Sequence, residues 1–164
     1  MKIQIVNEQD QVIGVKERSE LDYSKDIYRV SALWLVNSAG KALLAKRASN
    51  KDKDPGLWGP AVAGTVDEGE TYEDNIYKEA QEEIGLTGVP FTSGKKMRFS
   101  GDPRHYFCQW YFVTVDLGAD EFTLQESEVD EVAWVDVETM TLDLQQNPEK
   151  YIPTMIKIVE ELGI

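Results

Sequence analysis

The chain has 164 residues, of which 41% are hydrophobic and 10% aromatic, a composition ordinary for one globular domain with a real core. The formal net charge of -13 at pH 7 should repel nucleic acid polymers and anionic membrane surfaces, so neither is an expected partner. Cys108 is the only cysteine, which excludes an internal disulfide and a zinc site of paired cysteines. Because no apolar run reaches signal-peptide or membrane-spanning length, we expect a soluble cytoplasmic protein.

Alternating apolar residues predict a β-hairpin at the N-terminus, residues 1–18. Ile3 and Ile5 alternate with polar neighbours, and residues suited to a turn occupy positions 7–10. The apolar pattern resumes at Val12, as expected for the returning strand.

A second hairpin is predicted from two stronger strand segments, Arg29–Val36 and Lys41–Lys46, which are joined by Asn-Ser-Ala-Gly. The polar stretch Ser49–Pro60 follows and is punctuated by proline and glycine, which indicates a loop. Its residues are candidates for contact with a substrate.

A helix is predicted to follow the acidic segment that begins at Gly64. Thr71 is placed as its N-cap, and Asp74 three residues later completes a capping box. Gly85 stands where a left-handed C-terminal cap is needed. Apolar residues at helical spacing predict its buried stripe: Ile76, Ala80 and Ile84.

The second half of the chain predicts two further strands and a closing helix. His105–Val115 is rich in aromatic and β-branched residues, and Glu131–Val137 has a similar pattern. Apolar residues at helical spacing predict an amphipathic helix over 148–162. Together these elements predict an α/β fold in which helices cover a mixed sheet.

The central helix carries an unusual cluster of carboxylates. Glu79, Glu82 and Glu83 stand at positions i, i+3 and i+4, so their side chains leave one face of the helix together. Their mutual repulsion and their place in the last turn both oppose helix stability. An isolated helix of this kind is usually a solvated acidic face, but here the acidic loop 67–70 precedes it. Hard oxygen ligands in such a cluster suit Mg²⁺ or Mn²⁺, whose charge would cancel the repulsion.

The segment 64–86 resembles the Nudix box. Gly64 is followed after five residues by Glu70 and after seven more by Lys78-Glu-Ala-Gln-Glu-Glu-Ile-Gly-Leu. The single departure is Lys78, because the family has an arginine that pairs with the earlier glutamate. Lysine keeps the charge but loses the two-pronged contact, so we expect a more weakly anchored loop. The resemblance extends loosely over the chain and implies one domain, 1–164, with the α/β/α sandwich of that family.

The resemblance also implies a metal-dependent hydrolase of nucleoside diphosphates linked to some moiety X, a pyrophosphohydrolase that uses Mg²⁺ or Mn²⁺. Glu79, Glu82 and Glu83 would hold the cation, with the carbonyl of Gly64 as a further ligand. Glu70 and Lys78 would anchor the loop.

The general base and the substrate contacts are open at this stage. Glu82, Glu126 and Glu128 are candidate bases, and we favour Glu128, although an exposed loop acid is the plain alternative. Arg47 is a candidate for binding phosphates, or a surface residue at a strand end. Trp58 is a candidate for stacking on a base or ring, or a plug beneath its loop.

Two rival functions and a possible assembly stay open. Isopentenyl diphosphate isomerases share the scaffold and resemble the segment 57–64, but they need a cysteine and a histidine where this chain has Ala63 and Thr65. A noncatalytic nucleotide-binding domain is the other rival. The expected partner is a small diphosphate, a nucleotide or a nucleotide sugar, and the exposed strands also allow a homodimer.

Overall fold

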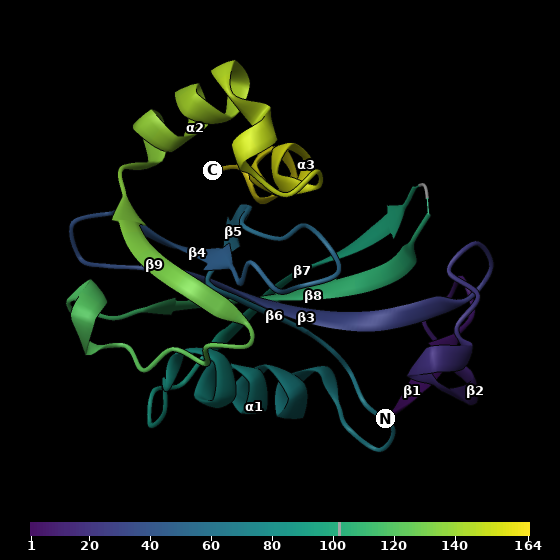
Figure 1. Cartoon of the computed structure of the whole chain (residues 1–164). Coiled ribbons are helices and arrows are strands. Elements are labelled where there is room, and N and C mark those ends of the chain that lie inside the picture. Colours follow the sequence, from purple (N-terminus) through teal and green to yellow (C-terminus); the bar gives the residue numbers. More distant parts are fainter. Residues whose placement is uncertain (102) are drawn as a thin grey trace.

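The computed structural model describes residues 1–101 and 103–164, with a mixed sheet between layers of helices (Figure 1). The strands are β1 Lys2–Val6, β2 Val12–Glu17, β3 Ile27–Val36, β4 Ala42–Arg47, β5 Trp58–Pro60, β6 Val62–Thr65, β7 Thr92–Ser100, β8 His105–Thr114 and β9 Val129–Val135. The helices are α1 Tyr72–Ile84, α2 Val137–Gln146 and α3 Met155–Leu162, with 3-10 turns at Arg18–Glu20, Ala119–Glu121 and Pro148–Lys150. In the described part of the chain, every helix is too short or too polar to cross a membrane.

The sheet divides into two lobes that meet at the end of β3. In one lobe β3 pairs in parallel with β8 over its whole length and antiparallel with β6. In the other lobe β4 pairs antiparallel with β5 and β9. The predicted hairpin of β3 and β4 is therefore correct only at its turn, where Val36 pairs with Ala42. Beyond that point the backbone N–H and C=O groups of β3 and β4 form hydrogen bonds with other strands, and β3 and β4 separate from each other.

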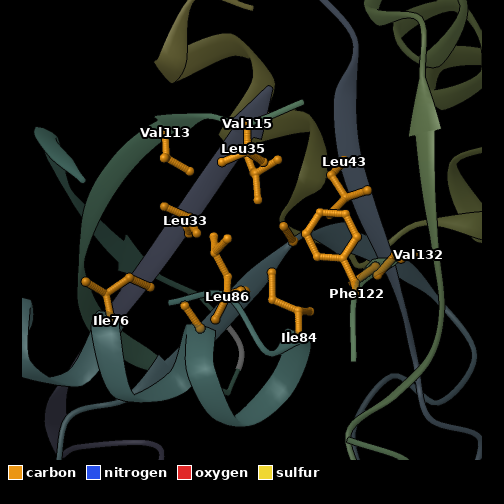
Figure 2. Close-up of a cluster of buried hydrophobic side chains, with 14 of the residues drawn as sticks. Leu33, Leu35, Leu43, Ile76, Ile84, Leu86, Val113, Val115, Phe122 and Val132 are labelled. Carbon is orange, nitrogen blue, oxygen red and sulfur yellow. The ribbon is translucent and has the colours of Figure 1, made fainter. Parts of the chain in front are cut away.

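Each face of the sheet is covered by helix, and a hydrophobic core fills both interfaces. Leu33 and Leu35 of β3 point toward Ile76 and Ile84 of α1 on one face (Figure 2). On the opposite face Ala32 and Trp34 join Trp110 and residues of α2 and α3. Strand alternation explains this division, because successive side chains of a strand point to opposite faces. The predicted mixed sheet between helices is thus confirmed.

The C-terminal part of the fold differs from the prediction. The helix predicted over 148–162 begins only at Met155, because Pro153 breaks the pattern and Tyr151 pairs with Trp58 in a β-bridge. The sequence patterns do not predict helix α2 or strands β5, β6 and β7, and β5 occupies Trp58–Pro60 at the end of the stretch predicted as a loop. Strand β7 contains three lysine and arginine residues, and its first half is exposed. It therefore lacks the alternation of apolar and polar residues from which a strand is predicted.

The predicted capping of α1 is present and sets the start of the helix. The Thr71 side chain accepts a hydrogen bond from the Asp74 N–H at 3.0 Å, and the Asp74 carboxylate accepts one from the Thr71 N–H at 3.0 Å. Gly85 ends the helix in the left-handed conformation with φ 69°. Both caps agree with the sequence pattern.

We expect Thr71→Ala to lower the free energy of unfolding by about 1 kcal/mol, because the Asp74 N–H loses its partner. Urea denaturation measures the change. Thr87→Ala is the control, since Thr87 is exposed and lies outside the helices. Equal stabilities of the two variants would contradict the capping role.

Candidate active site

The carboxylates of α1 lie against β6 because the helix approaches that strand closely at Gly64. A Cβ atom at Gly64 would collide with the side chain of Glu79. Gly64 is held in place by pairing with Ser31 of β3. A side chain at position 64 would therefore displace the Glu79 side chain from its place against β6.

Two of the three helix carboxylates are withdrawn from solvent. The side chain of Glu79 is 17% exposed and Glu83 is buried, whereas Glu82 is exposed. Burial raises the pKa of Glu79 to about 7, the charge of Lys78 opposes this, and the charges of Glu82 and Asp67 raise it again. Burial also raises the pKa of Glu83 well above its usual range, and the charges of Glu79 and Glu128 add to the effect. The protein alone therefore compensates these carboxylates poorly.

The chemistry of this donor set fits a divalent cation. The Oδ1 atom of Asp67 is buried without a hydrogen-bond partner in the described structure, and Asp67 lies beside the carboxylates of α1. Within residues 1–101 and 103–164 no three His, Cys, Asp or Glu side chains are placed to hold a metal ion together. A Mg²⁺ site does not need three such side chains, because this ion keeps several waters and usually takes only one or two carboxylates together with substrate phosphates.

A network of hydrogen bonds holds the acidic loop before α1. Lys78 Nζ lies 2.5 Å from Glu70 Oε1 and 2.9 Å from Asp67 Oδ2, so the lysine reaches two carboxylates in place of a two-pronged contact with one. Glu70 also accepts hydrogen bonds from the Asp67 N–H and from Asn75. Burial works against ionisation of Glu70, but these donors outweigh it and lower its pKa.

Sequence reasoning missed two members of this network. Gln4 of β1 donates from Nε2 to the carbonyl oxygens of Asp67 and Glu70, at 3.2 and 3.0 Å. Asn75 of α1 is fully buried and donates to the Thr65 carbonyl. A polar residue among the apolar residues of β1 was the available signal for Gln4, but its partner lies more than sixty positions away.

A cleft of about 1100 Å³ opens beside these carboxylates, between the two lobes of the sheet. Residues of β3 and β6 line it from one lobe and residues of β4 and β5 from the other. Its acidic lining residues are Asp52, Asp54, Asp67, Glu79, Glu82, Glu83 and Glu128. Its basic lining residues are Arg18, Arg47, Lys51, Lys53, Lys78, Arg104 and Lys157.

The candidate bases are separated by the turn that precedes β9. Glu128 lines the cleft, and Lys51 Nζ holds its carboxylate at 2.5 Å. Glu126 is exposed and outside the cleft lining, because it lies at the tip of a turn closed by the Glu128 N–H and the Gln125 carbonyl. The structure therefore brings Glu82 and Glu128 to the cleft and leaves Glu126 apart.

The two candidate substrate contacts also differ in position. Arg47 lines the cleft at the end of β4, and its Nε donates to the Lys53 carbonyl at 3.0 Å. Trp58 is outside the cleft lining and packs against the core beneath α2 and α3. Trp58 is therefore a packing residue in this structure. Its neighbours Gly59 and Pro60 are the residues of β5 that line the cleft.

Several lining residues had no signal in the sequence. Lys53 comes from the loop after β4, whereas Arg104 and Tyr106 lie around the start of β8, and these two distant segments meet only in the folded cleft. Tyr28 stands near the start of β3 and lines the same region. Their types are ordinary at their local positions, and therefore only the fold identifies them.

Comparisons with known proteins place the same residues in a family context. The NUDIX domain family matches residues 26–155. An uncharacterized Nudix hydrolase of Yersinia pestis is 31% identical over 140 residues, which cover 85% of this chain and 75% of that protein. An isopentenyl-diphosphate Delta-isomerase of Klebsiella pneumoniae is 26% identical, with 93% and 85% covered. The crystal structure of DR0079 from Deinococcus radiodurans superposes with a TM-score of 0.83 and 23% identity, and covers 98% of each chain.

We expect Glu70→Gln to destabilise the protein at pH 7 by roughly 1 to 3 kcal/mol, because it removes the charged partner of Lys78. The folded pKa of Glu70 is depressed, so its contribution is complete above the unfolded pKa of about 4.3 and disappears as pH falls through the folded value. Urea denaturation from pH 7 down to about pH 2.5, which passes through the unfolded pKa and below it, measures the difference from wild type.

Glu68→Gln is the matched control, since Glu68 is exposed in the same loop and has no ion pair among the described residues. A destabilisation by Glu70→Gln that stays constant over this pH range, or one matched by Glu68→Gln, would refute the anchoring role of the Glu70 charge.

Proposed function

The chain belongs to the Nudix family and is an enzyme of the pyrophosphohydrolase class, and on that premise we propose that it uses a divalent cation to cleave the diphosphate of a nucleotide or nucleotide sugar. The observation that carries the proposal is the poorly compensated group of Glu79, Glu83 and Asp67 at the side of a large cleft. A cation beside them would complete the charge balance that the side chains lack.

In this proposal Glu79, Glu82 and Glu83 hold Mg²⁺ or Mn²⁺, with the Gly64 carbonyl as a further ligand. When bound, the ion neutralises phosphate oxygens and increases the acidity of water. Lys78 and Glu70 keep the loop before α1 in position, so that the ligands need not rearrange during binding.

Glu128 is the proposed general base. Its carboxylate would take a proton from the attacking water as the oxygen of that water bonds to phosphorus and the P–O–P bridge breaks. Contact with Lys51 limits the orientations of the carboxylate, and Glu83 lies near enough to feel its charge. Arg47 is proposed to bind phosphate oxygens of the substrate from the opposite lobe.

Isomerisation of isopentenyl diphosphate is the second candidate, favoured by the similarity to the Klebsiella enzyme. Strand β6 has Ala63 and Thr65 on either side of Gly64, and neither side chain can serve as a proton donor of suitable acidity. Cys108 cannot replace them, because it is buried in the core on the face of α2 and α3 and burial raises its pKa. Hydrolysis is therefore the better supported reaction.

We expect Glu82→Gln to lower kcat for phosphate release from nucleoside diphosphate compounds by about 100-fold or more, because a ligand to the cation loses its charge. Glu82 is exposed, so the substitution should leave the fold intact. Glu73→Gln is the control on the same helix, since Glu73 lies in the first turn outside the cleft. A Glu82→Gln enzyme with wild-type kcat would refute the assignment of this residue.

We expect Glu128→Gln to lower kcat by roughly 10² to 10⁴, with a much smaller effect on KM, because an amide cannot accept the proton. Glu126→Gln, two residues earlier on the same turn, should retain wild-type kinetics. Steady-state assays of both variants at saturating Mg²⁺ make the comparison. The reverse order of effects would assign the base to Glu126.

A binding domain without catalysis predicts a different outcome in the same assays. It would bind Mn²⁺ and nucleotides, and it would release no phosphate from any diphosphate in a broad panel. Such a result with wild-type protein would replace the hydrolase proposal.

A further inference from the structure

About half of the lysine and arginine side chains form an ion pair with a described carboxylate, but one group of basic side chains in the cleft forms none with the described residues. Across residues 1–101 and 103–164, the basic side chains without a described carboxylate within 4.0 Å are Lys2, Arg18, Lys41, Lys46, Arg47, Lys53, Arg104 and Lys157. Those that line the cleft, which we term the cation wall, are Arg18, Arg47, Lys53, Arg104 and Lys157. In a protein with a net charge of -13, such a group of basic side chains without an ion pair to a described residue is unusual.

The fold fixes the central members of the cation wall in place. The Arg104 guanidinium lies 4.0 Å from the centre of the Tyr23 ring, and although burial alone would lower the pKa of Arg104, the neighbouring Tyr28 and Tyr23 side chains raise it. Arg47 is tied to the backbone of the loop that carries Lys53. Because these contacts limit side-chain motion, an anion would bind at a reduced entropic cost.

The cation wall is distinct from the acidic side of the cleft. Burial and the charges of Arg104 and Arg47 lower the pKa of Lys53, against the opposing charge of Asp54, although the Lys53 side chain still reaches solvent. The positive charges that act on Glu79 and Glu83 are instead Lys78 and Lys51. The basic groups near the helix carboxylates are therefore different from those near Lys53, where Asp52 and Asp54 also line the cleft.

We propose that the cation wall, through Arg104 and Lys53, binds a second anionic group of the substrate, separate from the diphosphate that is cleaved. The inference rests on the proposed function, and it narrows the substrate class to diphosphates whose organic part carries a further phosphate or carboxylate.

The size of the cleft and the chemistry of its wall both support this class. A volume of about 1100 Å³ is at the upper end for small-molecule sites and exceeds what a diphosphate alone would fill. A guanidinium beside an ammonium offers several donors to phosphate or carboxylate oxygens. A second anion would also relieve the repulsion among Arg104, Lys53 and Arg47.

Two pairs of compounds test the proposal, since the members of each pair differ in one anionic group. Adenosine 3′-phosphate 5′-diphosphate against ADP tests a phosphate, and UDP-glucuronate against UDP-glucose tests a carboxylate. We expect wild-type kcat/KM to favour the anionic member of at least one pair by about tenfold or more. The favoured pair identifies which anion the wall accepts.

Variants of the cation wall should remove this preference selectively. Arg104→Gln and Lys53→Gln should each bring the kcat/KM ratio of the favoured pair close to one, and kcat/KM for the neutral member should stay within about twofold of wild type. Lys41→Gln removes an equally unpaired charge outside the cleft and should keep the ratio. If Arg104→Gln misfolds, Lys53→Gln still tests the proposal. Lys53 Nζ makes no hydrogen bond to the described residues, so its loss should not disturb the fold.

Failure of this inference and failure of the proposed function give different results. A wild-type ratio near one in both pairs, with hydrolysis of ADP or UDP-glucose, overturns the second anion site and keeps the hydrolase. If no compound is hydrolysed, the hydrolase proposal fails, and calorimetric Kd values for the same compounds decide the inference. A binding preference lost in Lys53→Gln supports it, and equal Kd values within both pairs overturn it.

Discussion

The close contact between α1 and β6 at Gly64 is the constraint on which the rest of the site depends. The Glu79 side chain lies against Gly64 and Glu83 is buried, so two carboxylates with raised pKa values share a region of low solvent access. The helix tolerates this arrangement because its caps and its apolar face supply stability elsewhere. The strain is local, and it lies where a cation would remove it.

The acidic loop owes its shape to elements on both sides of it in the sequence. Lys78 joins Glu70 and Asp67 from the helix side, and Gln4 joins their backbone from the N-terminal hairpin. Arg29 in turn donates to the side chain of Gln4. The hairpin lies outside the segment 26–155 that matches the family, yet it supports the loop at the centre of the site. Loop anchoring is therefore shared among several residues, which compensates for the lysine at position 78.

The charge of the protein is arranged rather than uniform. The net charge is negative, but the cleft is lined both by carboxylates and by the basic side chains of the cation wall. In the proposed function, the cation wall would attract an anionic substrate that the net charge of the protein repels. The two lobes of the sheet make this possible, because each lobe contributes its own charges to the shared cleft.

The sequence by itself determined the local elements and the chemistry of α1. Capping residues and apolar periodicity act within one helix or strand. The caps at Thr71 and Gly85 and the buried face that contains Ile76 could therefore be predicted without knowledge of the fold. Only the tertiary structure decided that Gln4 supports the acidic loop, that Trp58 packs in the core and that Arg104 meets Lys53. Those outcomes depend on contacts between residues that are distant in sequence. The periodicity of apolar residues is a local property, so it does not predict which strands separate or which surfaces face each other.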